Sequence, residues 1–595
     1  MPTISVPADL LLKELHLTDE KSFDKLSASY GLELDDVVVE DGITQYKVDV
    51  PANRPELCCA EGMIISLNAF TGTEAAKPMR VTKEPEYTIT VDKSADSVRP
   101  YIVGAILRDV TFTKESYASF IDFQDKLHHN ICRRRALVAI GTHDLDKIEA
   151  AEGATKAFTY RAVDPVTGIS FAPLNQIEVM NGKRLMEFYE ADAHLKEYLP
   201  IIRDSPLYPT VRDGADRILS LPPIINSDYS KMSADTKNVF IECTATDLFR
   251  AKAVINTIVG TFSRYCKDPF TVEPVLVKYN PDCSERQLAA AGVYPDLAAD
   301  TFTVQADYIN RHTGLDLAAE EWAVYLRKMM HTVTVDNGAV HVKPCVIRTD
   351  VLHACDVVED AAIAYGFGRI PTSVPEMRCT GGLLPINRLT ELLRVELAGA
   401  GYSEALAFVL CSTDETSRCL EPTPLKDQAP ADPKDVALIA NSSQTECQAA
   451  RNNLLCGLLK TVAYNKSVPR PLKLFEVSDV VLLDPTNPLG AKNERRVCVL
   501  FSDEKYNFEV PHGVLSRVAT VLGIPGQLSI RPAEVHDSRT KVDHLMVKEG
   551  RAAVVEYKGK VIGSLGWVHP NVLANFDINY PCSCFEITLE PFVNV

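Results

Sequence analysis

Apolar and polar residues alternate along the chain in patterns that predict many short helices and strands. After Pro7, the leucines at positions 10, 11, 12 and 15 predict a helix, because proline is favoured in a first helical turn. The run at 239–241 predicts a strand, and Thr246 or Asp247 then predicts the N-cap of an amphipathic helix. A strand that leads into a capped helix offers free backbone N–H groups to an anion or an oxyanion.

The second half of the chain carries the same mixture of patterns. Residues 318–330 predict a helix, and the alternating residues of 331–344 predict two strands. Residues 386–401 predict another helix, while residues 552–568 predict a hairpin that turns at a Lys-Gly pair. Helical and strand segments therefore mix throughout, which is typical of an α+β protein.

An acidic cluster lies within residues 348–371, where the pattern predicts a short loop followed by a helix. Carboxylates spaced i, i+3 and i+4 share one face of a helix and repel each other unless a positive charge lies among them. Two interpretations stay open from the spacing alone. One is a solvated acidic face that Arg348 and Arg369 partly neutralise, and the other is a Mg²⁺ site. The four acids are Asp350, Asp356, Glu359 and Asp360.

A chain of 595 residues is too long for one hydrophobic core, so we expect several domains. The patterns predict a multidomain α+β protein with an N-terminal α+β module at 1–95 and a mixed α/β domain at 96–275. A small α/β module that holds the acidic helix follows at 276–375, and a larger α+β domain occupies 376–595.

Composition and charge narrow the class of protein. No apolar run is long enough to cross a membrane, and the N-terminus lacks the features of a transit peptide. The 16 cysteines form no disulfide framework, which favours a reducing compartment and a cytoplasmic location. The net charge of −18 is unusual for a protein that binds nucleic acid alone, so RNA contacts should be local or shared with a partner.

Several common sites are disfavoured by their spacing. His128, His129 and Cys132 lie close in sequence, but no second ligand pair follows at zinc-site spacing. No glycine pattern of a dinucleotide site or a P-loop follows a predicted strand. The three arginines at 133–135 are more often a solvated face than a nucleic-acid patch.

The acidic stretch closely resembles the same region of the phenylalanine–tRNA synthetase β subunit family, of the cytosolic eukaryotic and archaeal type. The resemblance extends from the N-terminal helix to the GWVHP sequence at 566–570. It implies that a winged-helix-like module holds Mg²⁺ beside an α subunit. The implied magnesium ligands are Asp350, Asp356, Glu359 and Asp360.

The resemblance also implies an editing domain at 96–275, where a second site hydrolyses tyrosine attached to the wrong tRNA. Such a site is needed because a pocket for phenylalanine rejects the added hydroxyl of tyrosine only about 100-fold. We expect Glu242 to bind the phenol hydroxyl or to orient water, with His143 and Asp144 as weaker candidates. For the Pro222-Pro223 pair we expect a role as a stiff loop support. The expected pocket residues are Leu219, Ser220, Pro222, Asn226, Glu242, Thr244, Thr246 and Asp247.

The C-terminal domain resembles a class II synthetase core, an antiparallel sheet domain, without a working active site. The family's second motif needs an arginine followed two residues later by glutamate, whereas asparagines follow Arg451. The resemblance therefore implies that ATP, phenylalanine and ester formation belong to a partner α subunit in an α₂β₂ assembly that acts on tRNA(Phe). The alternative is a structural and tRNA-binding subunit with an inactive editing pocket.

Overall fold

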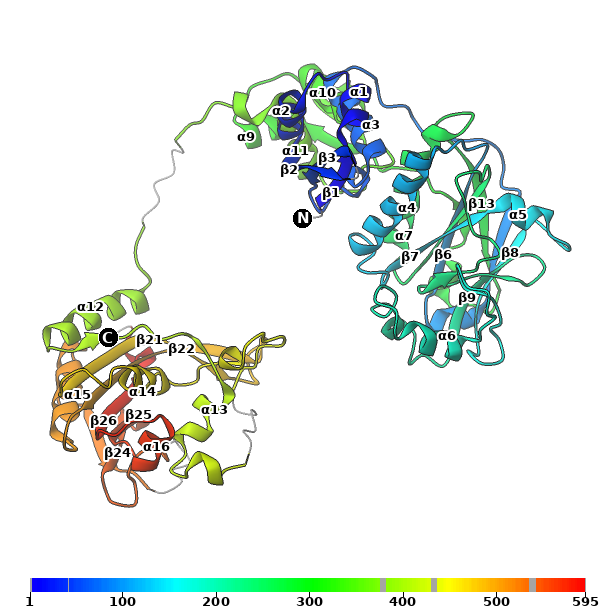
Figure 1. The fold of residues 1–595 in the computed structure, drawn as a ribbon. Helices are drawn as coiled ribbons and strands as arrows, with labels where there is room; N and C mark the ends of the chain where they lie inside the picture. Colours follow the sequence, from blue (N-terminus) through cyan, green and yellow to red (C-terminus); the bar gives the residue numbers. More distant parts are fainter. Residues whose placement is uncertain (1–2, 41, 375–380, 430–435, 535–541, 594–595) are drawn as a thin grey trace. The chain divides into compact units, whose positions relative to one another are not determined.

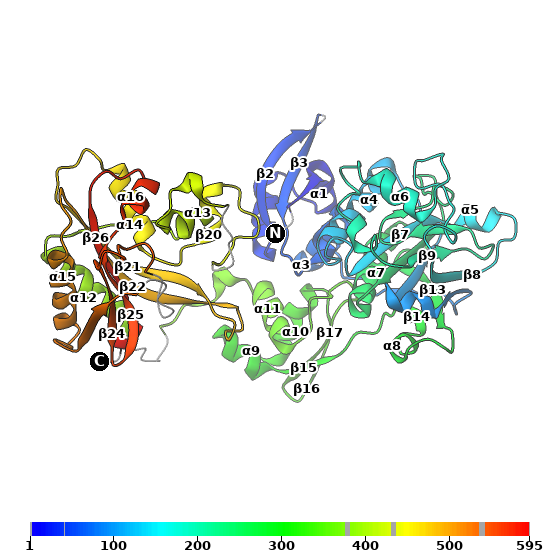
Figure 2. The same cartoon turned by 90° about the horizontal axis from the view of Figure 1, so that it is seen from below.

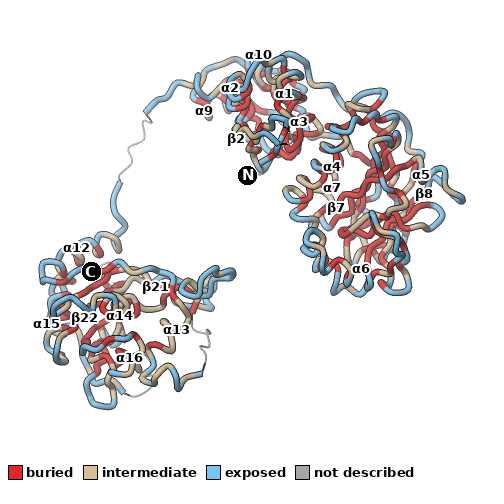
Figure 3. Tube along the Cα trace, in the orientation of Figure 1, coloured by how far each residue is buried: buried red, intermediate tan, exposed pale blue. Residues whose placement is uncertain are grey.

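The computed structural model describes residues 3–40, 42–374, 381–429, 436–534 and 542–593 (Figures 1 and 2). The chain forms two compact units, Met1–Val374 and Pro375–Val595. No helix among the residues described is long and apolar enough to cross a membrane. Buried residues concentrate in the sheets and on the inner faces of the helices (Figure 3).

The N-terminal module is a three-stranded antiparallel sheet covered by helices. The strand order is β1-β3-β2. The predicted helix is confirmed, since α1 begins at Ala8 directly after Pro7, its N-cap residue. The elements are β1 (Thr3–Pro7), α1 (Ala8–Glu14), α2 (Glu20–Tyr30), β2 (Glu33–Glu40), β3 (Ile43–Asp49) and α3 (Ala60–Thr71).

The mixed domain is built on a large sheet whose main path runs β11-β10-β9-β8-β5-β13-β6-β12-β7. Strands β4 (Arg80–Val81) and β14 (Gly292–Tyr294) also pair with β13. The strands of the main path are β5 (Tyr87–Val91), β6 (Tyr101–Leu107), β7 (Val138–Asp144), β8 (Ala157–Val163), β9 (Tyr208–Arg212), β10 (Ile218–Leu221), β11 (Ile225–Asn226), β12 (Val239–Ala245) and β13 (Thr271–Tyr279). The helices are α4 (Lys114–His129), α5 (Leu145–Ala150), α6 (Gly182–Tyr189), α7 (Leu248–Phe262) and α8 (Glu285–Leu288).

Strand β12 and helix α7 confirm the predicted strand-to-helix transition. Every residue of β12 is buried, and the strand pairs antiparallel with both β6 and β7. Side chains alternate across a strand, so Phe240, Glu242 and Thr244 point to one face of the sheet. The side chain of Asp247 accepts a hydrogen bond from Arg250 N and forms the N-cap of α7, which settles the choice between the two predicted caps.

The third region packs three helices against a three-stranded antiparallel sheet of order β15-β17-β16. The predicted helix at 318–330 and the predicted strands that follow it are confirmed. Trp322 is fully buried at the centre of this core. The elements are β15 (Phe302–Gln305), α9 (Ala306–Thr313), α10 (Ala319–Lys328), β16 (Thr332–Asp336), β17 (Ala339–Lys343) and α11 (Ala354–Tyr365).

The second unit is a seven-stranded sheet of order β18-β21-β22-β26-β25-β24-β23, with a separate β19–β20 pair. One core joins α12 and α15 to Phe475 and Val499, and another joins α14 and α16 to Leu474 and Leu500, so alternate strand residues serve opposite faces. The predicted hairpin is confirmed at β24–β25. The helices are α12 (Pro385–Gly399), α13 (Thr413–Thr416), α14 (Leu455–Tyr464), α15 (Glu509–Val521) and α16 (Pro570–Asn575). The strands are β18 (Ser403–Glu404), β19 (Leu410–Cys411), β20 (Ala449–Ala450), β21 (Leu472–Leu483), β22 (Ala491–Ser502), β23 (Leu528–Pro532), β24 (Ala552–Tyr557), β25 (Lys560–Trp567) and β26 (Cys582–Thr588).

Candidate functional site

The large sheet folds back so that residues from its two ends meet. Ser220 on β10 donates a hydrogen bond of 2.7 Å from its Oγ to Oε1 of Glu242 on β12. Both side chains are buried, with 2% and 1% of their residue surfaces exposed. Asn226 on β11 also reaches across and donates from Nδ2 to the carbonyl oxygen of Thr142 on β7, at 3.4 Å. The two walls predicted from sequence therefore face each other.

Three buried polar atoms at this meeting point have no hydrogen-bond partner among the described residues. They are Oε2 of Glu242, Nε2 of His143 and Oγ1 of Thr244. His143 Nε2 lies 3.9 Å from Glu242 Oε1, while His143 Nδ1 lies 2.8 Å from Ser230 Oγ. An unsatisfied buried polar group costs about 1–3 kcal/mol, so such groups are usually completed by water or a ligand. The arrangement therefore fits a binding pocket for a polar ligand group.

A glycine makes room for the Glu242 carboxylate. Gly141 on β7 pairs directly opposite Glu242 in the antiparallel register. A Cβ atom built on Gly141 would lie 2.2 Å from Glu242 Oε1, well inside van der Waals contact. Any side chain at this position would push the carboxylate out of its observed place.

Leu219 lies on β10 beside Ser220, and Pro222 follows the strand directly. Leu219 is fully buried and belongs to the main core of the first unit. The loop after β10 is held by Arg135, which donates hydrogen bonds to the carbonyl oxygens of Pro223 at 3.3 Å and Ile224 at 3.0 Å. This position agrees with the supporting role expected for the proline pair.

Three other predicted residues have local structural contacts. Thr246 is exposed, and its backbone N–H donates to Leu137 O at 2.9 Å. Asp247 caps α7, so its own carboxylate takes one of the N–H groups that the sequence pattern offered to an oxyanion. Asp144 caps α5 and accepts a 2.7 Å hydrogen bond from Thr236 Oγ1. No hydrogen bond joins these three residues to Glu242 in the part of the chain that the structure describes.

Sequence reasoning missed Gly141, Ser230 and Arg99. A glycine inside a strand pattern often marks a close approach of another group, and this was the available signal for Gly141. Arg99 is 1% exposed, and its Nη2 donates to the carbonyl oxygen of Thr244 at 2.9 Å. Burial lowers the pKa of Arg99 from its ordinary value. No local sequence pattern predicts that an arginine will be buried or that a serine will orient a histidine.

The acidic cluster is organised around Arg348. This guanidinium is buried and makes two hydrogen bonds to the Asp350 carboxylate, at 2.9 and 2.8 Å, and one of 2.8 Å to Asp360 Oδ1. Asp360 Oδ2 lies 2.6 Å from His331 Nε2. Although burial alone would raise the pKa of Asp360, Arg348 and His331 hold it well below its ordinary value. These two carboxylates thus already have protein partners.

The remaining acids lie apart from that network. Asp356 Oδ2 accepts hydrogen bonds of 2.8 Å from the backbone N–H groups of Leu352 and His353, at the start of α11. Glu359 is exposed, and its pKa is raised by partial burial and by its acidic neighbours. Arg369, the second arginine of the solvated-face interpretation, stacks over the Tyr365 ring and donates a hydrogen bond to Tyr365 O.

As arranged, these acids do not fit a magnesium site. Within the described ranges, no group of three or more His, Cys, Asp or Glu side chains is placed to hold a metal ion. Arg348 occupies the position between the two inner carboxylates that a cation would need. Magnesium binding by these four residues therefore stays a prediction.

Arg451 in the second unit has a structural environment. Its guanidinium is buried against Glu476, with Nη1 to Oε1 at 2.6 Å, and Nε donates to Asp479 O at 3.1 Å. An arginine with these partners is not available to hold ATP phosphates. This placement agrees with the expected loss of the class II active site.

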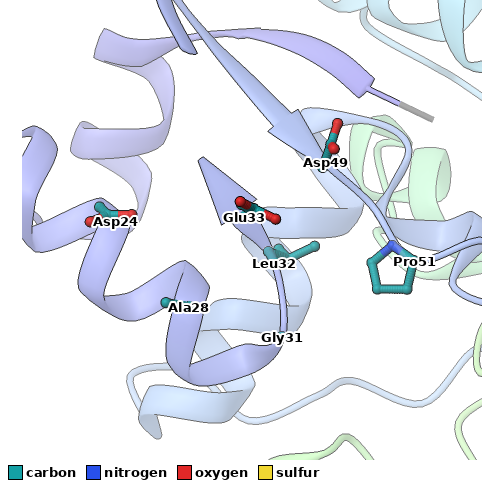
Figure 4. Close-up of a pocket in the computed structure, with 7 residues that line it drawn as sticks. All are labelled: Asp24, Ala28, Gly31, Leu32, Glu33, Asp49 and Pro51. Atoms are coloured by element: carbon teal, nitrogen blue, oxygen red, sulfur yellow. The ribbon is translucent and has the colours of Figure 1, made fainter. Parts of the chain in front are cut away.

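A cavity of about 350 Å³ lies in the N-terminal module, between α2 and the strands that follow it (Figure 4). It is open to solvent and contains none of the predicted site residues. Its lining residues are Asp24, Ala28, Gly31, Leu32, Glu33, Asp49 and Pro51.

Family models match four parts of the chain. Residues 1–73 match the Phe-tRNA synthetase beta subunit B1 domain, and residues 98–259 match the B3/4 domain. Residues 302–367 match the tRNA synthetase B5 domain, and residues 370–589 match the phenylalanyl tRNA synthetase beta chain CLM domain. The pocket described above thus falls within the B3/4 match.

Whole-chain relatives and a solved structure agree with these matches. The chain is 44% identical to the phenylalanine–tRNA ligase beta subunit of Drosophila melanogaster and 39% identical to that of Homo sapiens, over 100% of both chains in each case. It is 40% identical to the Arabidopsis thaliana subunit named as cytoplasmic, over 99% of this chain and 100% of that one. An N-terminal fragment of the Pyrococcus horikoshii phenylalanyl-tRNA synthetase beta subunit is 31% identical, with a TM-score of 0.55 over 61% of this chain and 99% of the fragment. The chain therefore belongs to the phenylalanine–tRNA ligase β subunit family.

Proposed function

We propose that this chain is the β subunit of a cytoplasmic α₂β₂ phenylalanine–tRNA ligase, and that its pocket between β10 and β12 hydrolyses Tyr-tRNA(Phe). The subunit role rests on relatives that match over their full length. In this assembly the α subunit binds ATP and phenylalanine and forms the ester, while this chain supplies tRNA contacts and editing. The buried ion pair of Arg451 supports that division of labour.

The observation that carries the editing proposal is the buried Oε2 atom of Glu242, which has no hydrogen-bond partner among the described residues. A phenol hydroxyl can donate a hydrogen bond to this oxygen, whereas phenylalanine leaves it buried without a partner. A site that is built to bind a hydroxyl group rejects the analogue without it by roughly 10⁴-fold. The pocket thus suits hydrolysis of tyrosyl esters and protection of phenylalanyl esters.

His143 and Thr244 add two further polar side chains to the proposed site. If Nδ1 of His143 carries the proton and donates it to Ser230 Oγ, Nε2 is left as an acceptor beside Glu242. Thr244 Oγ1 lies two residues further along β12 on the same face and has no partner of its own. These atoms can hold the ester group or a water molecule while Glu242 reads the ring hydroxyl.

The test is deacylation of Tyr-tRNA(Phe) by the assembled enzyme carrying Glu242→Gln or Glu242→Ala. We expect kcat/KM for hydrolysis to fall about tenfold to 100-fold, because a buried hydrogen bond to a charged group is lost. The exposed carboxylate of Glu187 on α6 provides the matched control, Glu187→Gln. Unchanged hydrolysis by both Glu242 variants would reject this pocket. A wild-type enzyme that never clears Tyr-tRNA(Phe) would instead support the purely structural alternative.

A further inference from the structure

Three consecutive arginines between α4 and β7 adopt a backbone conformation that side chains disfavour. Arg133, Arg134 and Arg135 have φ angles of 46°, 50° and 62°, all in the left-handed region. We call residues 133–135 the arginine turn. Left-handed backbone at residues other than glycine costs free energy, and it persists only where surrounding contacts enforce it. Such strain is most often found at functional sites.

The contacts that enforce the arginine turn come from both walls of the editing pocket. Arg99 Nη1 donates to the carbonyl oxygens of Arg135 and Ala136, at 3.2 Å each, while its Nη2 donates to Thr244 O on β12. The Arg135 guanidinium lies 4.1 Å from the centre of the Tyr198 ring and donates to the Pro223–Ile224 loop after β10. The turn is therefore fixed relative to the pocket by two independent anchors.

The other two arginine side chains of the turn are left facing solvent. Arg133 is exposed, and its guanidinium group has no hydrogen-bond or ion-pair partner among the described residues, whereas its backbone bonds to Asn130 and Ala136. Arg134 has a side chain that is 73% exposed, with a loose contact of 3.6 Å to Glu197. Because this protein carries a net charge of −18, an exposed pair of guanidinium groups at the pocket is a local exception to its overall charge. An acidic protein that binds RNA requires a local group of positive charges of this kind.

The neighbouring elements bring charges of both signs to the arginine turn: Glu197 contacts Arg134, and Asp247 forms a 3.3 Å ion pair with Arg250. Arg250 in the first turn of α7 donates from Nη1 to Ile131 O at 3.5 Å, next to the turn. Asn130, directly before Ile131, donates from Nδ2 to Ala52 O of the N-terminal module at 3.4 Å. Arginine binds phosphate with a planar set of donors that can form two parallel hydrogen bonds. The occupant best matched to this surface is a flexible phosphate backbone that leads into the pocket.

We propose that Arg133 and Arg134 bind phosphates of the single-stranded 3′ end of a tRNA, and so guide the mischarged ester into the pocket. This inference rests on the proposed editing function, since the ester is attached to that end of the tRNA. The anchored turn fixes the backbone from which the Arg133 and Arg134 side chains extend into solvent, so both guanidinium groups stay close to the proposed site.

The experiment measures tRNA binding by the assembled α₂β₂ enzyme carrying Arg133→Gln and Arg134→Gln together. The two probes are intact tRNA(Phe) and the same tRNA lacking its last four nucleotides. For intact tRNA we expect Kd to rise about tenfold, and the slope of log Kd against log salt to fall by about 1.4, at ~0.7 for each lost phosphate contact. For the truncated tRNA we expect the double variant and the wild-type enzyme to bind with the same Kd.

The matched control replaces Arg184 and Arg311, two exposed arginines on α6 and α9, with glutamine. Equal weakening for intact and truncated tRNA would overturn the proposal, because the arginines would then bind another part of the RNA. No weakening at all would overturn it as well. Hydrolysis of Tyr-tRNA(Phe) by the same enzymes is measured separately, and we expect the variant to raise KM rather than lower kcat. A wild-type enzyme that binds as expected but hydrolyses nothing would reject the editing function alone.

Discussion

Ser220 Oγ and Glu242 Oε1 are 2.7 Å apart, although the two residues are separated by 22 positions and lie on strands β10 and β12 of the same folded-back sheet. The hydrogen bond fixes one oxygen of the carboxylate, and the other oxygen is buried without a hydrogen-bond partner in the part of the chain that the structure describes. The hydrogen bond from Ser220 keeps the Glu242 carboxylate from rotating towards other donors. A carboxylate held in this way can discriminate between ligands. The proposed selection of tyrosine over phenylalanine depends on that restraint.

Ser220→Ala tests whether orientation of Glu242 matters separately from its charge. With the hydroxyl removed, neither Glu242 oxygen keeps a hydrogen-bond partner, at a cost of about 1–3 kcal/mol. We expect kcat/KM for Tyr-tRNA(Phe) deacylation to fall about tenfold, with a smaller preference over Phe-tRNA(Phe). Thr257→Val is the matched control, since Thr257 donates a buried 2.7 Å hydrogen bond to Ala253 O within α7. Equal losses in both variants would indicate a general loss of stability.

Gly141→Ala tests whether the pocket needs the space beside Glu242. The added Cβ would lie 2.2 Å from Glu242 Oε1, so the carboxylate or the strand must move. Crowding of this kind typically costs about 1–3 kcal/mol, and we expect Tyr-tRNA(Phe) deacylation to fall at least about tenfold. Thermal unfolding and deacylation of the assembled enzyme are both measured. Gly292→Ala is the control, because no atom lies within 4 Å of a Cβ at that position. Wild-type deacylation by Gly141→Ala would show that Glu242 need not stay where it is.

Local structure around the pocket could be read from the sequence, because it depends on neighbouring residues. The change from strand to helix spacing near Asp247 predicted both β12 and α7, and Asp247 forms the expected cap. The approach of Ser220 to Glu242 could not be derived in the same way. It depends on the register of a nine-stranded path whose distant ends fold together, and no short pattern encodes that register.

The acidic helix shows the same limit more clearly. The pattern of residues 348–371 correctly predicted a helix after a short loop, which is α11. It did not show that Asp360 turns inward to Arg348 and His331 while Glu359 stays exposed. Which side of a helix is buried depends on the elements packed against it, here α9, α10 and β15. An identical spacing would suit either a metal site or a buried ion-pair network.

The roles of Asp360 and Glu359 can be distinguished by mutation, because Asp360 contacts Arg348 whereas Glu359 is exposed. Asp360→Asn leaves the buried Arg348 guanidinium with less negative charge around it, and breaking a buried pair costs about 3–5 kcal/mol. We expect a lower melting temperature for this variant, equal in magnesium and in excess chelator, because a protein cation neutralises Asp360. Glu359→Gln should keep the melting temperature of the wild type in chelator. Loss of stability in Glu359→Gln but not in Asp360→Asn would contradict the ion-pair network.

The magnesium prediction rests on the exposed side of the same helix. Partial burial and the carboxylates of Asp360, Asp350 and Asp356 raise the pKa of Glu359, so a cation bound there would relieve repulsion. If Mg²⁺ binds, chelator should weaken association of the α and β subunits of the wild-type enzyme, and Glu359→Gln should reproduce that effect in the presence of magnesium. Sedimentation of the assembled enzyme measures the association directly. An α₂β₂ assembly that is equally stable with and without chelator would contradict a magnesium ion at this helix and leave Arg348 and Arg54 as the cations beside Asp350.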